Sequence, residues 1–249
     1  MERPSYFMRG NLWRHAGVNR KNILAMKHRL FLCATLLALS FTSYAQQFSF
    51  GVLGGYSLTD VIVKEPRTLV VEGFPDYDVD AYYKPLHSWH AGAEARLQHN
   101  DRLAFAAGLR YSRKGYRTDA DKVSAGGISD LYLYYLNLPV VADYSLWRNF
   151  SLQAGLEPGY LLHMRVKLDG VTVKPANKFY NDFDLGAVAG LEFRINDAFY
   201  VGLRHTFGIY SVAEIEYTDP NGESAGNTRT RNSATQLSIG YRFKTGASK

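Results

Sequence analysis

Residues 183–210 read FDLGAVAGLEFRINDAFYVGLRHTFGIY, and this stretch decides the fold. Within 183–194 every second residue is apolar, from Phe183 to Phe193, and the residues between them are small or charged. The same alternation resumes at Phe199 after Asn196 and Asp197, a pair typical of tight turns. A period of two residues indicates β-strands, so the stretch predicts a β-hairpin.

The second face of this hairpin indicates its surroundings. It consists mostly of glycine with isolated Asp, Glu and Arg residues, which suits a narrow lumen better than a water-exposed surface. The apolar face is then left to contact lipid. Strands of about ten residues with this pattern are typical of transmembrane β-barrels, and the signal gains weight by repetition.

The pattern repeats along the chain. Further alternating segments cover 48–58, 89–98, 103–112, 132–144, 150–162 and 236–243. Tight turns at 100–102, 146–149 and 196–197 alternate with long connections at 59–87, 115–130, 167–182 and 213–234. This regularity predicts an all-β fold, an eight-stranded antiparallel transmembrane β-barrel with up-and-down meander topology. Pro139 lies inside the fourth segment, where we expect a bulge because proline cannot donate a ladder hydrogen bond.

A soluble eight-stranded barrel such as a lipocalin is the alternative fold, and it predicts large apolar residues on the inner face. Here the face opposite the apolar one carries charge. An eight-stranded barrel has little interior space, so we expect these side chains to fill the lumen and to pair across strands. A proton path or a gated channel is the alternative. The residues predicted to line the lumen are Glu94, Arg96, Arg110, Asp143, Glu157, Glu192, Arg194, Arg204 and Arg242.

The beginning of the chain predicts export. Residues 26–29 are basic, 30–41 are apolar, and small residues precede Gln46, as in a secretory signal peptide cut after Ala45. We expect 26–45 to be the signal peptide, 46–243 the outer-membrane barrel domain and 244–249 a C-terminal tail. Residues 1–25 are expected to be a mis-assigned upstream start, with an extended n-region as the alternative. The chain's single cysteine, Cys33, falls within the leader.

The net charge of +6 does not indicate nucleic-acid binding. Seven of the 29 Lys and Arg residues, and one of the 23 acidic residues, precede Gln46, which leaves 22 of each sign in the remainder. The basic excess therefore belongs to the targeting segment, and we expect no nucleic-acid partner.

Two histidine sets are the candidates for catalysis: His205 with Tyr210 and Ser211, and His163 with Asp169. Neither belongs to a known catalytic motif such as a nucleophile elbow or a zinc-binding His-Glu-x-x-His. We therefore expect no enzymatic activity.

The first long connection is expected to be an extracellular loop. Its acidic run, Asp76, Asp78 and Asp80, lacks the glycine and the distal glutamate of a known calcium loop, so we expect no metal and no cofactor. Its apolar and aromatic residues are candidates for contacting a partner, namely Leu69, Val70, Val71, Phe74, Tyr77, Tyr82 and Tyr83.

Several segments resemble the PorT-like outer-membrane β-barrels of Bacteroidota. They are YYLNLPVV at 134–141, AGLEPGY at 154–160, the glycine-containing segments 183–190 and 203–208, and the closing GYRF at 240–243. The resemblance implies the barrel architecture and no particular activity. The closing segment is similar to the aromatic C-terminal strand that the barrel-assembly machinery recognises, which assigns that role to Tyr241 and Phe243.

Together these observations predict a non-enzymatic outer-membrane barrel with a filled lumen. Its expected role is structural, or binding and accessory through the extracellular loops, and the alternative is a small passive or gated channel. The expected partners are outer-membrane lipid, the barrel-assembly machinery during biogenesis, and a protein or ligand at the extracellular loops.

Overall fold

The computed structural model describes residues 47–64, 68–69, 77–78, 83–118, 129–168, 171–173, 180–218 and 224–243. The predicted leader and C-terminal tail lie outside these residues, as do Asp169 and most of the acidic and aromatic loop residues named above.

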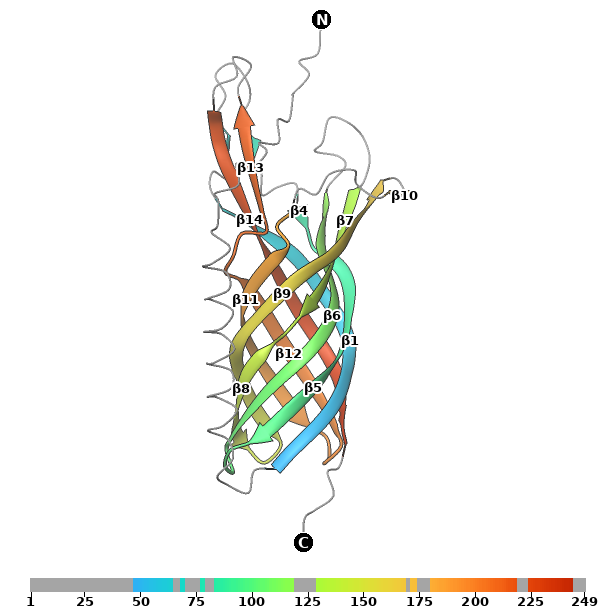
Figure 1. Cartoon of the computed structure of the whole chain (residues 1–249), viewed down its shortest axis with the longest axis vertical. Coiled ribbons are helices and arrows are strands. Elements are labelled where there is room, and N and C mark those ends of the chain that lie inside the picture. The colour runs from blue at the N-terminus through green and yellow to red at the C-terminus, as the bar shows by residue number, and fades with distance from the viewer. Residues whose placement is uncertain are drawn as a thin grey trace, which may run out of the picture.

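The described strands form a closed antiparallel barrel (Figure 1). The ring order is β1, β5, β6, β7 with β8, β9, β11, β12 and β14, and β14 pairs with β1 to close it. The prediction of eight ring strands is confirmed. β7 and β8 both lie between β6 and β9, one after the other, and together they form one strand of the ring. The ring strands are β1 (Gln47–Lys64), β5 (Leu86–Gln98), β6 (Leu103–Thr118), β7 (Ser129–Asn137), β8 (Val140–Trp147), β9 (Phe150–Leu168), β11 (Phe183–Arg194), β12 (Phe199–Gly208) and β14 (Ser224–Arg242).

Five shorter strands add to this ring. β4 (Tyr83–Lys84) pairs with β6, β10 (Val171–Val173) with β9, and β13 (Ala213–Thr218) with β14, while β2 (Thr68–Leu69) and β3 (Tyr77–Asp78) form a separate pair. In the described part of the chain, no helix is long and apolar enough to cross a membrane.

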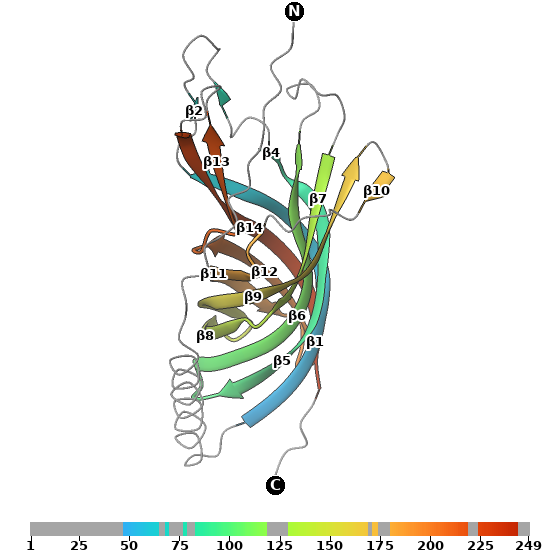
Figure 2. The ribbon, with the colours of Figure 1, turned by 45° about the horizontal axis from the view of Figure 1, so that its top comes forward.

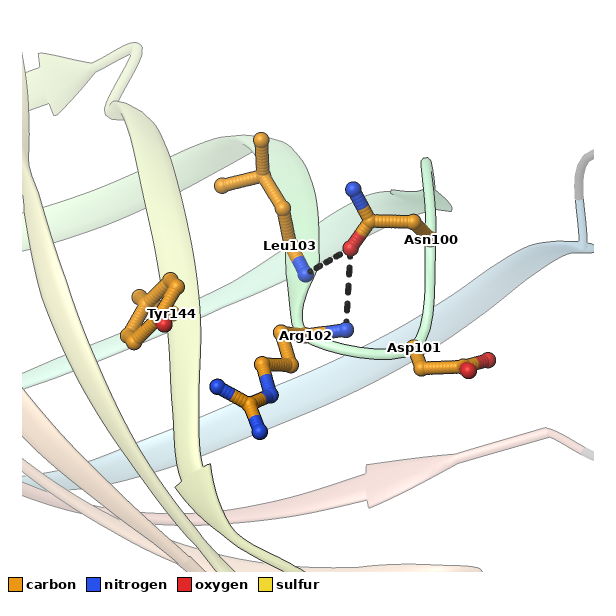
Figure 3. A pocket seen from close by; sticks show the side chains of 5 residues that line it. All are labelled: Asn100, Asp101, Arg102, Leu103 and Tyr144. Carbon is orange, nitrogen blue, oxygen red and sulfur yellow. Dashed lines mark hydrogen bonds between the residues drawn. The ribbon is translucent and has the colours of Figure 1, made fainter.

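Asparagine side chains hold two of the tight turns. Asn100 Oδ1 accepts hydrogen bonds from the backbone N–H groups of Arg102 at 2.9 Å and Leu103 at 2.8 Å (Figure 3). Asn196 Oδ1 accepts the equivalent bonds from the residues two and three positions ahead, at 2.9 and 2.8 Å. Both turns lie at the end of the barrel where β1 begins and β14 finishes (Figure 1). Short turns are characteristic of the periplasmic end, so this end faces the periplasm.

Two bands of aromatic side chains encircle the outer wall, with aliphatic side chains between them. The periplasmic girdle comprises Phe48, Phe50, Phe105, Tyr144, Trp147, Phe150, Phe193, Phe199, Tyr241 and Phe243. The extracellular girdle comprises Tyr56, Trp89, Tyr111, Tyr134, Tyr160, Phe183, Phe207 and Tyr210. Aromatic girdles on either side of an apolar band mark the two membrane interfaces. The wall between them is therefore the lipid-facing part of the barrel.

Above the extracellular girdle the strands continue, and the polarity of their two faces inverts. In β1, Val61 and Val63 point inward and are buried, whereas Asp60 and Lys64 lie on the outer face. A buried apolar cluster lies on β7 and β9, two strands that run side by side in the upper part of the ring (Figure 2). This upper apolar cluster comprises Leu131, Leu133, Tyr135, Leu161 and Met164. The interior of the extracellular part thus contains large apolar side chains, as in a water-soluble barrel.

Several strands extend beyond their predicted ends, because the polarity of their two faces inverts there. β1 continues to Lys64, β6 to Thr118 and β9 to Leu168, beyond the ends predicted at 58, 112 and 162. Residues 213–234, predicted as a loop, contain β13 and the first part of β14, which pair as a hairpin. The predicted ends relied on an apolar outer face, and that criterion fails once the strands leave the bilayer.

The bulge predicted at Pro139 is absent. β6 pairs Arg110 with Asn137 and Ala107 with Val140, so the two residues between these pairs on β6 lie opposite two residues, Leu138 and Pro139, on the other strand. Pro139 interrupts the strand without shifting its register, and its carbonyl accepts a 2.9 Å hydrogen bond from the N–H of Gly108. The register shift in this region lies between Tyr134 and Tyr135, in the ladder with β9.

Candidate functional site

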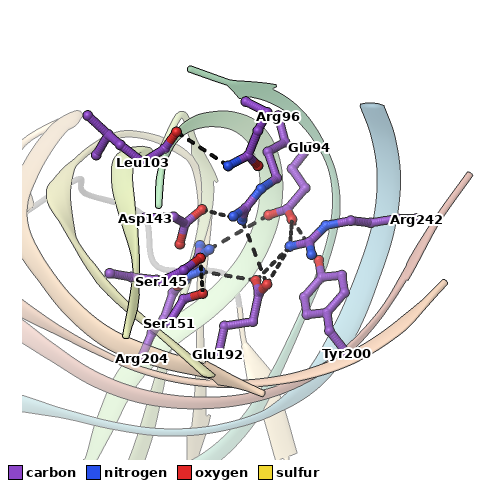
Figure 4. Close-up of polar contacts among 12 residues, drawn as sticks. Glu94, Arg96, Leu103, Asp143, Ser145, Ser151, Glu192, Tyr200, Arg204 and Arg242 are labelled. Atoms are coloured by element: carbon purple, nitrogen blue, oxygen red, sulfur yellow. Dashed lines mark hydrogen bonds and ion pairs between the residues drawn. The ribbon is translucent and has the colours of Figure 1, made fainter. Parts of the chain in front are cut away.

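The lumen below the extracellular girdle holds a layer of buried polar and charged side chains from seven strands (Figure 4). None of them is more than 9% exposed. We call this layer the lower cluster, and its members are Glu94, Arg96, Arg110, Asp143, Gln153, Glu192, Tyr200, Arg204 and Arg242.

Glu192 joins one side of the lower cluster. Its carboxylate lies 2.7 Å from Arg242 Nη2 and accepts a 3.1 Å hydrogen bond from Gln153 Nε2. Arg96 Nη1 lies 3.7 Å from the same carboxylate and 2.5 Å from Asp143 Oδ2. These contacts link β5, β8, β9, β11 and β14 through the centre of the barrel.

Glu94 joins the other side. Its carboxylate lies 3.5 Å from Arg110, 3.7 Å from Arg204 and 3.5 Å from Arg242, and it accepts a 2.8 Å hydrogen bond from the Tyr200 hydroxyl. The Arg242 guanidinium also lies 4.2 Å from the centre of the Tyr200 ring. Since Arg242 contacts both glutamates, the two halves of the lower cluster form one network that crosses the lumen.

Glycines on neighbouring strands provide the space for these long side chains. Three lower-cluster arginines pair across the ladder with glycine: Arg110 with Gly92, Arg204 with Gly190, and Arg242 with Gly51. A Cβ added at Gly190 would lie 2.7 Å from Arg204 Cγ, and one at Gly92 would lie 2.9 Å from Arg110 Cγ. The glycines on the inner face therefore leave the space that the long charged side chains occupy.

A second group of charges lies higher in the lumen. Lys114 Nζ is 3.1 Å from Glu157 Oε1 and 3.0 Å from Asp184 Oδ2, and all three residues are fully buried. Asn232 Nδ2 donates to Asp184 at 2.9 Å and to the Tyr135 hydroxyl at 3.3 Å. We call Lys114, Glu157 and Asp184 the Lys114 triad.

The predicted lumen set omitted Lys114 and Asp184. Lys114 keeps the parity of Arg110 along β6, but the predicted strand ended at 112. Asp184 shares the inner face of β11 with Glu192 and could have been found from the same alternation. With all groups ionised, four arginines face three carboxylates in the lower cluster, and one lysine faces two carboxylates in the triad. The two groups carry opposite net charges of one unit, which cancel.

Between the two groups lies a neutral hydrogen-bonded layer. His90 Nδ1 is 2.8 Å from Ser57 Oγ, and His90 Nε2 is 2.8 Å from Ser238 Oγ. Asn137 Nδ2 donates to Ser112 Oγ at 2.6 Å. Toward the extracellular side, the lower cluster is thus followed by a neutral layer and then by the Lys114 triad, which lies beside the upper apolar cluster.

Arg194 differs from the other residues predicted in the lumen. It lies near the periplasmic rim and is half-buried. Its Nη2 donates to the Arg148 carbonyl at 2.5 Å, and it forms no ion pair with the described residues. The structure therefore places it beside the β8–β9 turn, at the periplasmic edge of the lower cluster.

The histidines considered for catalysis lie on the outer face. His205 Nδ1 is 2.8 Å from Thr235 Oγ1, and its Nε2 is 3.3 Å from Ser233 Oγ, so its partners are not the predicted Tyr210 and Ser211. The His163 ring stacks on that of Tyr134, with 4.2 Å between the ring centres, while Asp169 lies outside the described residues.

The C-terminal aromatic residues belong to the periplasmic girdle. The Tyr241 ring centre is 5.0 Å from that of Phe199 and 5.3 Å from that of Phe243. The Phe243 N–H donates to the Phe50 carbonyl at 2.8 Å, at the seam where β14 meets β1. Both side chains are exposed on the lipid-facing wall.

The described residues contain no group of three or more His, Cys, Asp or Glu side chains suited to hold a metal ion. What the lumen does contain is a set of neutralised charges whose partners come from opposite walls.

Comparison with known protein families identifies a β-barrel domain in this chain. The family model described as "Outer membrane protein beta-barrel domain" matches residues 44–214. A search of curated proteins finds no match.

Several solved structures are similar to this chain. The attachment invasion locus protein Ail of Yersinia pestis is 15% identical with a TM-score of 0.41, covering 79% of this chain and 99% of Ail. Neisserial surface protein A is 13% identical with a TM-score of 0.43, covering 79% and 99%. OprG of Pseudomonas aeruginosa is 12% identical with a TM-score of 0.42, covering 80% and 98%.

Proposed function

The chain belongs to the outer membrane protein beta-barrel domain family, and from this premise we propose that it is a non-enzymatic, non-conducting barrel that acts through its extracellular end. It resides in the outer membrane, where its lipid-facing band spans the bilayer. The proposal concerns what the lumen and the extracellular part of such a barrel do.

The observation that carries the proposal is the sequence of layers in the lumen. The lower cluster crosses from wall to wall, the Lys114 triad lies above it, and the upper apolar cluster begins beside the triad, where Lys114 pairs with Leu133. A conducting pore needs a continuous water-filled path, whereas these layers place paired charges and then apolar side chains along the axis. The lumen is therefore proposed to serve as the barrel's core.

The extracellular part supports a binding or accessory role. β1, β6, β9 and β14 extend beyond the extracellular girdle, and β13 and β14 form a hairpin that projects above the ring (Figure 1). A rigid, protruding support of this kind suits the display of loops to a partner. The same proposal includes a protein or ligand partner at the extracellular loops and membership of the PorT-like branch. It also includes recognition of Tyr241 and Phe243 by the barrel-assembly machinery.

Single-channel recording tests this function. The chain from Gln46 is refolded into planar bilayers after heat-modifiable gel mobility has verified a closed barrel. We expect no steady openings from the parent chain. A Glu192→Ala/Arg242→Ala variant, which removes the 2.7 Å ion pair of the lower cluster, shows whether the assay detects a lumen that has been partly emptied.

A passive or gated channel remains the second candidate because some lumen polar atoms lack a protein partner. Arg110 Nε and Nη1, Thr206 Oγ1 and Gln236 Oε1 are buried without a hydrogen bond from the described residues. Such atoms are where water would enter a permeable lumen. Steady openings in the parent chain would favour this candidate and reject the filled lumen.

A further inference from the structure

Basic and aromatic side chains gather on the outer face of three adjacent strands, from the extracellular girdle at Tyr134 toward the extracellular side. The pairing of β6, β7 and β9 sets them in three cross-strand rows. We call them the basic grid, whose rows are Arg113, Tyr134 and His163; then Gly115, Tyr132 and Arg165; then Arg117, Asp130 and Lys167.

The position of the grid corresponds to the lipid headgroups. The next row toward the periplasm is Tyr111, Leu136 and Tyr160, which belongs to the lipid-facing wall and its girdle. Rings at this depth mark the membrane interface, so the row above them meets the headgroups of the outer leaflet. The grid carries four Lys and Arg residues against one aspartate.

Arg113 is held in place by the protein. Its Nε donates to Ser88 Oγ at 3.0 Å, and its Nη2 donates to the His87 carbonyl at 3.1 Å. Its guanidinium lies 4.7 Å from the centre of the Tyr132 ring. None of these contacts neutralises its charge.

The aspartate of the grid is already paired. Asp130 accepts hydrogen bonds from Arg117 Nε at 2.5 Å and Nη2 at 3.0 Å, in a two-pronged ion pair. Arg165 is exposed and lies 6.0 Å from the centre of the Tyr134 ring, and neither Arg165 nor Lys167 forms an ion pair with the described residues. Among the described residues, Arg113 and Arg165 thus have no carboxylate partner, and Lys167 lies opposite an aspartate that Arg117 already holds.

We propose that the basic grid binds the phosphate of an outer-leaflet lipid headgroup through Arg113, Arg165 and Lys167. Arginine presents donors in a fork that matches phosphate oxygens, and basic clusters at a membrane surface recognise anionic lipids. The rings of Tyr132 and Tyr134 face the guanidinium groups of Arg113 and Arg165, respectively. The binding residues are scattered along the sequence, and strand pairing brings them together.

A fluorescence experiment tests the proposal. Trp89 lies next to the grid's lower neighbour Tyr111, with 5.6 Å between ring centres, whereas Trp147 lies in the periplasmic girdle. In a chain from Gln46, Trp147→Phe leaves Trp89 as the sole tryptophan. This protein is placed in phosphatidylcholine nanodiscs containing a small fraction of phosphatidic acid. Bromine is carried on the acyl chains of either the phosphatidic acid or an equal amount of phosphatidylcholine.

We expect brominated phosphatidic acid to quench Trp89 more strongly than brominated phosphatidylcholine. Each basic side chain near an anionic membrane surface contributes roughly five-fold in affinity, so Arg165→Gln/Lys167→Gln should weaken the preference about 25-fold. The control Arg102→Gln/Arg148→Gln removes the same charge from exposed periplasmic turns and should leave the preference unchanged. Arg165→Lys should retain most of it, and heat-modifiable mobility verifies that each variant forms a barrel.

Equal quenching by the two lipids in the parent chain would overturn the proposal. So would a preference that survives in the Arg165→Gln/Lys167→Gln variant. Soluble glycerol phosphate serves as a competitor. Displacement of phosphatidic acid by the same concentration of glycerol phosphate would assign the grid to a free phosphate compound and reject the lipid.

Discussion

Replacing Lys114 with methionine tests whether the lumen is packed with side chains or filled with water. The substitution keeps most of the side chain's volume and removes its charge. It leaves the carboxylates of Glu157 and Asp184, which flank the ammonium at 3.1 and 3.0 Å, without their shared cation. Among the described side chains, Asp184 keeps only the neutral amide of Asn232 as a donor, at 2.9 Å.

The expected cost follows from these contacts. At an effective dielectric constant of about 20, unit charges about 3 Å apart attract by about 5 kcal/mol, and this gain is offset by the cost of removing the charges from water. Removing one partner of a buried ion pair costs about 3–5 kcal/mol. Since Lys114 serves two carboxylates, we expect Lys114→Met to lower the free energy of unfolding by an amount in the upper part of that range, about 4–5 kcal/mol.

Urea titration of the barrel in lipid vesicles measures this free energy. The triple variant Lys114→Met/Glu157→Gln/Asp184→Asn removes all three charges and should recover most of the loss, because neutral groups leave no uncompensated charge. Lys64→Met, at an exposed position on the outer face of β1, is the matched control and should change stability by less than about 0.5 kcal/mol. A loss below about 1 kcal/mol for Lys114→Met is what a solvated ion pair gives, and it would refute the packed lumen.

Three further predictions concern other parts of the barrel. Gly115 has a φ of 134°, and a Cβ there would collide with the Leu131 carbonyl, so Gly115→Ala should lower the free energy of unfolding in urea titration by about 2 kcal/mol or more. At Gly202 the nearest atom to an added Cβ is 3.8 Å away, so Gly202→Ala should be nearly neutral. Equal costs for the two variants would contradict the argument. The hydrogen bond from Arg117 holds the pKa of Asp130 below its usual value of 3.8, so this pair contributes its full stability above about pH 4 and loses it as the pH falls through the lowered pKa. The unfolding midpoint of Asp130→Asn should accordingly depend less on pH below about pH 4 than that of the parent, and parallel curves would exclude the linkage. Tyr241→Ala should reduce the amount of heat-modifiable barrel in cells several-fold. Phe199→Ala removes the ring that packs against Tyr241 and should not reduce this amount. A similar loss in both variants would mean that Tyr241 acts only as a member of the girdle.

The membrane-spanning part of the fold could be predicted because one rule holds throughout it. Between the girdles each strand alternates lipid-facing and lumen-facing residues, so the predicted strands 183–194 and 199–209 match β11 and β12 to within one residue. Above the girdle the outer face meets water and the inner face is apolar. Val61 and Val63 then look like an interrupted pattern, although the strand continues through them.

The candidate site shows the same limit. Parity alone assigns charged residues such as Glu94 and Glu192 to the inner face, but which cation each one meets depends on register and on which strands face each other across the lumen. Lys114 was missed because the predicted strand stopped too early. The basic grid could not be read from the sequence, because its members lie at 113–117, 130–134 and 163–167 and meet only through pairing.

Thiol accessibility inside the barrel tests the central claim most directly. A chain beginning at Gln46 has no native cysteine, so single cysteines can be introduced without a background signal. Ser57→Cys and Ser112→Cys place a thiol at positions that are 1% exposed in the lumen, and Asp101→Cys places one on an exposed periplasmic turn. We predict that a small charged methanethiosulfonate reagent labels the cysteine at 101 rapidly and leaves those at 57 and 112 unmodified in the folded barrel. Labelling at 57 or 112 at a rate close to that at 101 would show a water-filled path and contradict the account.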